Sequence, residues 1–170
     1  MPTLKKGKGV IFGANVQLGD SVAIWNYVVI GDNARIGDRT CIGSFCDIGK
    51  NVEIGSNCNI QAHVTISNGC ILGDNVFIAP SSTLLNDKYP KSSLLTPPIV
   101  KDNVIIGGGV TVLPNVVLGN NCVIGGGSVV AESIPSGKVA IGVPAREIMS
   151  VEEYNLKRET FIKEKRKVHP

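Results

Sequence analysis

Residues 30–55 read IGDNARIGDRTCIGSFCDIGKNVEIG, and an isoleucine recurs in this stretch at every sixth position. The same step runs back to Phe12 and forward to Leu84, and a second run extends from Val100 to Val130. Every position on the step is apolar, and the residue two places before it is mostly small or β-branched. Side chains two apart on a strand share a face, so both point inward. Each hexad therefore predicts one short strand with an inward-facing pair.

The remaining positions of the hexad predict a corner. Glycine directly follows the aliphatic residue in many repeats, and Asp, Asn or Ser often comes next. These residue types tolerate a sharp corner and a positive φ angle. Three strands and three corners close a triangular coil of 18 residues, whose turns stack by parallel strand pairing. Pro80 and Pro114 fall in the second corner position, where no ladder hydrogen bond is lost. The pattern leaves the handedness open, although crossover statistics favour right-handed connections.

The period breaks once and then ends. The step from Leu84 to Val100 is 16 residues, so residues 85–99 must leave the coil as a protruding loop. Loops of this length in a compact domain are usually functional or disordered. After Val130 the repeat decays into a charged segment with a helix-like composition. We expect a β-helix domain at residues 1–148 and a C-terminal helix or tail at residues 149–170, which caps the last coil or packs on a neighbouring chain.

Composition excludes several classes of function. The chain has 17 Lys and Arg residues against 14 Asp and Glu, and a net charge of +3 is too small and too dispersed for a nucleic-acid-binding surface. No stretch approaches the ~18 consecutive apolar residues of a membrane span. The N-terminus is basic but has no apolar stretch behind it, so it does not resemble a signal peptide. We therefore expect a cytoplasmic protein with no nucleic-acid and no membrane partner.

The cysteines and histidines do not predict a metal site. Four of the five cysteines occupy the small inward position, which favours packing in the core: Cys46, Cys58, Cys70 and Cys122. Cys41 faces outward, and no Cys-x-x-Cys pair is present. A catalytic zinc usually takes three protein ligands, and of the two histidines only His63 lies in a hexad. His63 falls in an outward position, where it is either inert or placed at a face between subunits.

Two glycine triplets, 107–109 and 125–127, lie 18 residues apart and therefore one above the other on the same corner. A corner needs one glycine, so the triplets favour a bare groove where backbone N–H and C=O groups meet an extended ligand. The alternative is that they are ordinary corner glycines with an extra neighbour.

The protruding loop carries a dense polar cluster, Asn-Asp-Lys-Tyr-Pro-Lys at residues 86–91. A solvated surface loop is the alternative interpretation. Together with the two hexad runs and the closing Ile-Gly-Val-Pro-Ala-Arg at residues 141–146, the cluster resembles the hexapeptide-repeat acetyltransferases over residues 10–148. Within that family the chain is similar to enzymes of the UDP-2-acetamido-3-amino-2,3-dideoxyglucuronate N-acetyltransferase type, which acetylate 3-amino sugars carried on UDP or dTDP.

Three matches carry the closer resemblance. Residues 24–27 read Ile-Trp-Asn-Tyr, Asn86 stands ahead of the excursion, and Pro90-Lys91 occupies the place of a Pro-Arg pair. Lysine offers a point charge where arginine offers a bidentate fork, so the identity of the substrate is less constrained than the fold.

The resemblance implies a left-handed β-helix, acetyl-CoA as acyl donor, no metal, and a homotrimer with active sites between neighbouring chains. It implies a place in cell-surface polysaccharide or glycan biosynthesis. The implied catalytic residues are Asn86, which orients the amine, and Asp87 as the possible base. The implied substrate-binding residues are Trp25, His63, Tyr89 and Lys91. The implied acetyl-CoA contacts are Gly107, Gly108, Gly125, Gly126, Ser128, Lys138 and Arg146.

The reaction expected of these residues is attack of a neutral sugar amine on a thioester carbonyl, with backbone N–H groups holding the oxyanion. A hydroxyl acceptor would require a stronger base, normally histidine, and the loop has none. This favours an amine acceptor, although His63 keeps a sugar O-acetyltransferase open. A non-catalytic β-helical scaffold is the remaining alternative.

Overall fold

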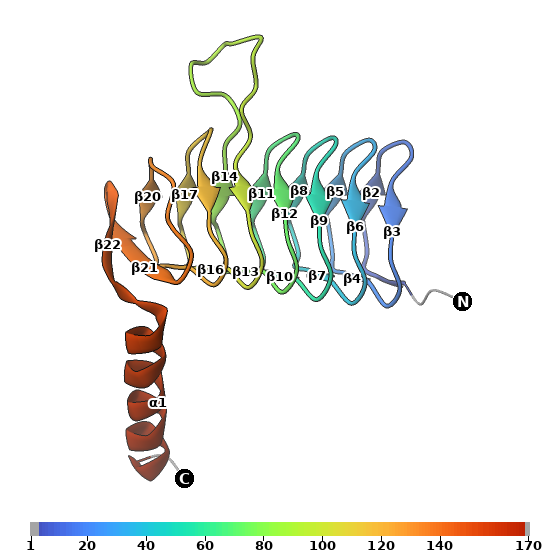
Figure 1. Cartoon of the computed structure of the whole chain (residues 1–170). Helices are drawn as coiled ribbons and strands as arrows, with labels where there is room; N and C mark the ends of the chain where they lie inside the picture. The colour runs from blue at the N-terminus through green and yellow to red at the C-terminus, as the bar shows by residue number, and fades with distance from the viewer. Residues whose placement is uncertain (1–3, 169–170) are drawn as a thin grey trace.

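The computed structural model describes residues 4–168, in which the chain winds into a left-handed parallel β-helix followed by a helix (Figure 1). The predicted fold class is confirmed. Each side of the triangular coil is a parallel sheet made of two-residue strands, one from each turn, and sheet A ends in two longer strands that form an antiparallel hairpin. The helix α1 spans Val151–Val168.

Within residues 4–168 the strands form three sheets of nine, seven and six strands, here named sheets A, B and C. Sheet A contains β1 (Lys5–Lys6), β4 (Ala23–Ile24), β7 (Cys41–Ile42), β10 (Asn59–Ile60), β13 (Phe77–Ile78), β16 (Ile105–Ile106), β19 (Val123–Ile124), β21 (Lys138–Gly142) and β22 (Ala145–Ser150). Sheet B contains β2 (Ile11–Phe12), β5 (Val29–Ile30), β8 (Asp47–Ile48), β11 (Thr65–Ile66), β14 (Thr83–Leu84), β17 (Thr111–Val112) and β20 (Val129–Val130). Sheet C contains β3 (Gln17–Leu18), β6 (Arg35–Ile36), β9 (Glu53–Ile54), β12 (Ile71–Leu72), β15 (Ile99–Val100) and β18 (Val117–Leu118).

The register of the sheets shows the predicted turn of 18 residues. Lys5 pairs with Ala23 in sheet A, and the other sheets follow the same spacing. Across the excursion the spacing is instead 28 residues in all three sheets, as between Ile71 and Ile99 in sheet C, because the excursion is inserted between β14 and β15. The excursion therefore covers residues 85–98. The prediction of a loop at residues 85–99 is wrong at its last residue, since Ile99 belongs to β15.

The aliphatic positions of the six-residue step form the core, as predicted. All of them are buried except Phe12 and Leu18, which lie at the N-terminal end of the coil and are half-buried. The small inward positions join the same core, including the four cysteines assigned to it. Burial of one aliphatic and one small side chain per hexad is thus the main source of stability of the coil.

The corners differ from the sequence prediction in one respect. The glycine after the aliphatic residue is required by close approach: a Cβ atom on Gly31 would lie 2.6 Å from the backbone nitrogen of Lys50 in the next turn. The positive φ angle falls two residues later, as at Asn33 with φ of 59°. The residue between them caps the preceding turn, since the N–H of Ala14 donates to Oδ1 of Asp32 at 2.9 Å. Attributing the positive φ to the Gly-Asp or Gly-Asn pair was therefore wrong.

The C-terminal end carries a hairpin that the hexad pattern does not predict. Strand β21 pairs in parallel with β19 and antiparallel with β22, which closes sheet A (Figure 1). Helix α1 starts after Ser150, contacts β21 and β22, and points away from the coil (Figure 1). The hairpin, not the helix, therefore covers the end of the coil. Within residues 4–168, no helix combines the length and the apolar composition that a membrane crossing requires.

Candidate functional site

The three corners of the coil present different side chains. We name them by the sheets they join: the A–B corner (for example residues 43–46), the B–C corner (for example 49–52) and the C–A corner (for example 55–58). The glycine triplets 107–109 and 125–127 both fall at the A–B corner, because they follow β16 and β19. The excursion follows β14 and rises from the B–C corner (Figure 1).

The two glycine triplets stack directly, as the sequence predicted. The N–H of Gly127 donates to the carbonyl oxygen of Gly108 at 2.8 Å. A Cβ atom built on Gly109 or on Gly127 would meet no atom within 4 Å, so open space lies outside both. We call residues 107–109 and 125–127 the glycine strip. The strip is a stretch of backbone without side chains, and its role as a groove for an extended ligand stays a prediction.

The glycine strip also leaves backbone donors unpaired. At several other corners a side-chain oxygen of the next turn accepts the N–H at the second corner position, as Asp32 does for Ala14, although among residues 4–168 the N–H groups of Ser44 and Ala62 have no such partner. Gly126 lies above Gly108 and has no side chain to do so. Among residues 4–168, neither the N–H of Gly108 nor that of Gly126 donates a hydrogen bond. The strip therefore offers two free N–H groups to an oxyanion or an amide carbonyl.

Ser128, predicted to contact the cofactor, is turned into the core. Its side chain is buried, its hydroxyl donates to the carbonyl oxygen of Gly125, and it accepts the N–H of Gly142 at 3.1 Å. These bonds tie the last corner to β21. Ser128 therefore supports the glycine strip from behind.

The A–B corner carries aromatic side chains in earlier turns. Tyr27 and Phe45 stack with ring centroids 5.4 Å apart, and Phe45 and His63 with centroids 4.9 Å apart. We call these three residues the aromatic ladder. Trp25 begins the same corner, and its Nε1–H donates to Sγ of Cys41 at 3.3 Å. His63 is exposed, as its outward position predicted.

Asn86 lies at the foot of the excursion. Its side-chain Nδ2 donates to the backbone carbonyl oxygen of Asn68 at 3.0 Å, and its backbone carbonyl oxygen accepts the N–H of Thr96 at 2.8 Å. A shallow polar hollow beside it is lined by Asp47 and Thr65 of sheet B. Asn86 therefore closes the neck of the excursion, and among residues 4–168 its Oδ1 and its second amide hydrogen have no partner.

Asp87 shapes the loop that follows. Its two carboxylate oxygens accept the N–H groups of Tyr89 at 3.2 Å and Ser92 at 2.9 Å. Tyr89 is 75% exposed and Lys91 is exposed, so both are free to meet a ligand. The role of Asp87 as a base stays a prediction, and its contacts assign it to holding the loop.

One chain does not bring the predicted site residues together. Asn86, Tyr89 and Lys91 share the excursion, whereas the glycine strip lies across sheet B at the A–B corner. Trp25 is a third location. It precedes β5, which lies three strand steps from β14 in sheet B. At ~4.8 Å a step, about 14 Å along the axis separates Trp25 from the turn that carries Asn86.

Lys138 and Arg146, two of the implied acetyl-CoA contacts, lie at different ends of the hairpin. Arg146 pairs in register with Ile141, whose side chain closes over Gly125, so Arg146 is adjacent to the glycine strip. Lys138 begins β21 at the far side of sheet A. Both have carboxylate partners: NH1 of Arg146 is 3.4 Å from Oε1 of Glu132, and Nζ of Lys138 is 3.9 Å from Oε2 of Glu147. Arg146 is the better placed of the two.

The inward cysteines are packing residues. All five cysteines are free, and burial raises the pKa of the Cys46 thiol to about 11 and those of Cys70 and Cys122 to about 12. Burial also raises the pKa of Cys58. Residues 4–168 contain no group of three His, Cys, Asp or Glu side chains arranged to hold a metal ion.

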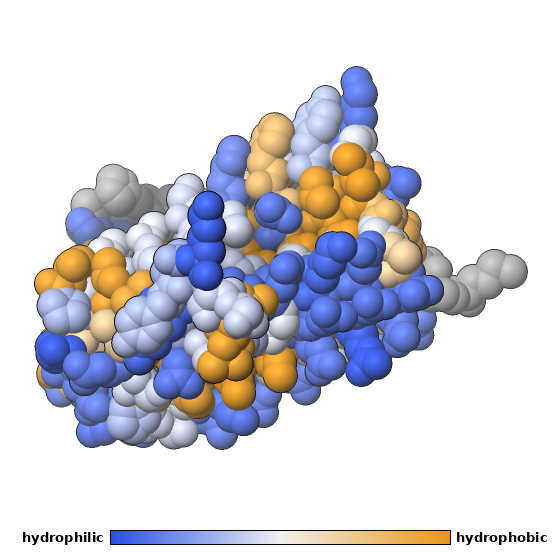
Figure 2. Space-filling view, turned by 90° about the horizontal axis from the view of Figure 1, so that it is seen from above, coloured by the Kyte–Doolittle hydropathy of each residue, from blue (hydrophilic) through white to orange (hydrophobic). Residues whose placement is uncertain are grey.

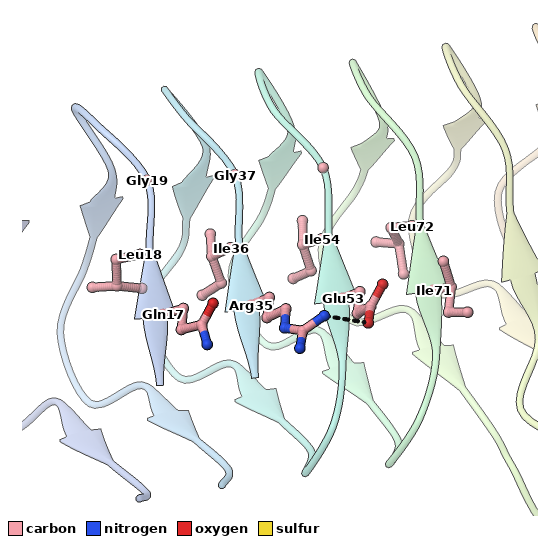
Figure 3. A pocket seen from close by; sticks show the side chains of 11 residues that line it. Gln17, Leu18, Gly19, Arg35, Ile36, Gly37, Glu53, Ile54, Ile71 and Leu72 are labelled. Atoms are coloured by element: carbon pink, nitrogen blue, oxygen red, sulfur yellow. Dashed lines mark hydrogen bonds and ion pairs between the residues drawn. The ribbon is translucent and has the colours of Figure 1, made fainter. Parts of the chain in front are cut away.

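A separate hollow lies on the outer face of sheet C (Figure 3). The ion pair between Arg35 and Glu53, with 3.3 Å between NH1 and Oε1, runs along it, and Ile71 lies at its end (Figure 3). None of the predicted site residues lines this hollow. It is a feature of an exposed sheet face and not of the candidate site.

Comparison with known families fits these observations. The six-repeat model of the bacterial transferase hexapeptide family matches residues 33–68, 51–86 and 97–132, together more than half of the chain. The chain belongs to this family.

Two similar curated proteins are named for different acetyl acceptors. The chain is 40% identical over 58 residues to a 2,3,4,5-tetrahydropyridine-2,6-dicarboxylate N-acetyltransferase of Clostridium perfringens, covering 34% of the chain and 25% of the relative. It is 33% identical over 90 residues to the galactoside O-acetyltransferase of Escherichia coli K12, covering 48% and 44%. The chain thus spans less than half the length of these curated relatives.

A solved structure gives the same picture of the coil. The hexapeptide-repeat acetyltransferase of Vibrio cholerae O1 biovar eltor complexed with acetyl-CoA superposes with a TM-score of 0.51 at 25% identity, covering 68% of this chain and 69% of that one.

Three features of this hexapeptide-family chain were missed in the sequence. The aromatic ladder was detectable, because Tyr27, Phe45 and His63 are spaced by 18 residues. The free N–H groups of the glycine strip were also detectable once the capping role of the second corner residue is known. The hairpin of β21 and β22 lies outside the repeat and gave no periodic signal.

Proposed function

We propose that this chain transfers an acetyl group from acetyl-CoA to the amino group of a nucleotide-linked amino sugar. The observation that carries the proposal is the glycine strip with its two unpaired N–H groups, in a chain of the hexapeptide transferase family. The Vibrio cholerae relative holds acetyl-CoA, and the two curated relatives are an N-acetyltransferase and an O-acetyltransferase. The product would feed glycan or surface polysaccharide assembly.

The glycine strip is the proposed binding site of the acyl donor. An extended pantetheine arm fits along stacked backbone without side chains, and Arg146 beyond Gly125 meets a phosphate of the cofactor. The thioester carbonyl accepts the N–H of Gly108 or Gly126. These donors stabilise the oxyanion that forms when the amine attacks.

The excursion is the proposed binding site of the acceptor. The free Oδ1 of Asn86 accepts a hydrogen bond from the sugar amine and orients its lone pair, since an amide cannot take up a proton. Lys91 meets a carboxylate or phosphate of the acceptor. The C–N bond forms first and gives the oxyanion, whose collapse then breaks the C–S bond, and the proton lost by the amine ends on the thiolate of CoA.

Two copies of the chain are needed to assemble this site. Sheet B separates Asn86 from the glycine strip of its own chain, so the excursion of one copy must reach the strip of its neighbour. Outward apolar residues support such packing: Ile71 is 42% exposed and Val117 is 38% exposed on sheet C. Hydrophobic residues also gather in separate areas on the side of the excursion (Figure 2). A closed trimer satisfies these requirements.

The test is release of CoA thiol with a panel of UDP- and dTDP-linked sugars that carry either an amine or only hydroxyls. We expect turnover with amino sugars, and we expect Asn86→Ala to lower kcat at saturating acceptor. Ser93→Ala, in the same excursion and exposed, is the matched control and keeps parent turnover.

Three results decide between the alternatives. Parent turnover by Asn86→Ala would show that the excursion does not act as proposed. Turnover with hydroxyl sugars alone would favour an O-acetyltransferase, which is the function in the name of the Escherichia coli relative, with exposed His63 as the base. Absence of any thermal stabilisation by acetyl-CoA would favour a scaffold.

A further inference from the structure

The aromatic ladder is not required by the corner it occupies. Its three residues sit in the third corner position, where φ is positive, with angles of 57° at Tyr27, 61° at Phe45 and 60° at His63. The same position at the other corners is mostly asparagine, which tolerates this region far better than a bulky ring. Tyr27 and Phe45 are also about half exposed. Backbone strain at exposed aromatic residues is typical of binding sites.

The ladder ends at a position that one more ring would fill. The third corner position of the next turn is Ser81, which is exposed, and the two turns beyond it have Gly109 and Gly127. Among residues 4–168, the ring of His63 stacks on that of Phe45 and on no other ring. One face of the His63 imidazole is therefore covered by Phe45, and no ring covers the other.

The spacing of the coil sets the geometry of this vacant position. Successive turns are ~4.8 Å apart, which is why the existing rings stack with centroids 5.4 Å and 4.9 Å apart. A planar group lying over Ser81 would stand at the same distance from His63. The position opens directly onto the glycine strip.

We propose that a nucleobase stacks on the free face of His63 and takes the ladder position over Ser81. The inference rests on the proposed function, because that function brings two nucleotides to this corner: the acceptor with its uracil or thymine, and the cofactor with its adenine. Arg146 at the other end of the glycine strip favours the cofactor phosphates there, which leaves the His63 end for the base of the acceptor.

The experiment follows the imidazole C–H resonances of His63 by proton NMR during titration with UMP, dTMP, AMP and ribose 5-phosphate, without an acetyl donor. The chain has two histidines, and His169→Gln assigns the resonances. We expect upfield ring-current shifts with a nucleotide and none with ribose 5-phosphate. A stronger response to UMP or dTMP assigns the position to the acceptor, and a stronger response to AMP assigns it to the cofactor.

Two substitutions at equivalent backbone positions provide the control. Ser81→Phe fills the ladder position with a ring of the chain itself, and Phe45 shows that phenylalanine is accepted at such a φ. Asn75→Phe places the same ring at the C–A corner, where φ is 57° and no ladder exists. We expect Ser81→Phe to weaken nucleotide binding on the order of tenfold and Asn75→Phe to leave it unchanged. Thermal melts verify that both variants fold.

Two outcomes would overturn the stacking position. One is an equal response of His63 to ribose 5-phosphate and to the nucleotides. The other is parent affinity of Ser81→Phe for every nucleotide tested. Because no acetyl donor is present, these outcomes are independent of whether the chain transfers acetyl groups. In the turnover assay the second outcome appears as a parent KM of Ser81→Phe for amino-sugar nucleotides, which refutes the stacking position while leaving the transferase in place.

Discussion

Gly126→Asn should separate stability from activity, because it repairs a corner that the proposed site leaves open. At the C–A corner the equivalent residue is Asn120, whose Oδ1 accepts the N–H of Asp102 at 3.0 Å. An asparagine at position 126 would cap the N–H of Gly108 in the same way. A Cβ atom there would lie 3.2 Å from the carbonyl oxygen of Gly108, so the neighbouring turn must yield by a few tenths of an ångström.

The two effects of this substitution have opposite signs. One added hydrogen bond contributes about 0.5–1.5 kcal/mol to the free energy of unfolding, reduced by the small steric shift. Loss of one oxyanion donor lowers kcat by roughly 10²–10³, and the new side chain also narrows the glycine strip. We therefore expect unchanged or higher stability together with nearly abolished turnover.

Urea denaturation and the thiol-release assay measure the two effects on the same preparation. Asn120→Gly is the matched control: it uncaps Asp102, lowers the free energy of unfolding by about 1 kcal/mol and keeps parent kcat. The reasoning fails if Gly126→Asn retains parent kcat, since the free N–H of Gly108 would then have no part in the reaction.

Two further predictions concern the core. Thr40→Val should lower the free energy of unfolding in urea by about 1–3 kcal/mol. The reason is that the buried hydroxyl of Thr40 donates to the carbonyl oxygen of Gly55 at 2.8 Å and accepts the N–H of Cys58 at 3.1 Å. An unchanged urea midpoint of unfolding would contradict this role. The raised pKa values of Cys70 and Cys122, about 12 against an ordinary 9.0, mean that the unfolded chain loses thiol protons above pH 9 while the folded chain keeps them. Stability measured in urea should therefore decline as pH rises from 9 toward 12. At pH 8 a thiol reagent should modify Cys41 first and the inward cysteines only on unfolding. Early modification of Cys70 would contradict the burial of the inward cysteines.

The sequence was sufficient for the architecture because the repeat is regular and its physical meaning is local. An aliphatic residue every six positions has one packing solution, and the structure buries it at every turn beyond the N-terminal end. The same periodicity does not say which corner residue takes the positive φ, because all three corner positions recur with the same six-residue period. That distinction depends on the close approach of the next turn, as at Gly31.

The site was predictable in parts. Counting by 18 places the two glycine triplets together, and the break after Leu84 locates the excursion. The same count also places the excursion and the triplets at different corners, once the residues that the excursion adds to its turn are left out of the count. How two chains approach each other depends on surface complementarity and not on the repeat. The hairpin of β21 and β22 has no period to reveal it, and its pairing with β19 depends on tertiary contact alone.

The central claim is that the glycine strip of one copy works with the excursion of its neighbour, and mixed oligomers test it most directly. Gly126→Asn damages the strip, Asn86→Ala damages the excursion, and each variant alone should be nearly inactive. When the two are unfolded together, refolded at equal concentrations and assayed, randomly mixed trimers should recover about one quarter of the parent sites. If each site instead lies within a single chain, every chain in the mixture carries one lesion, and the mixture will stay as inactive as its components.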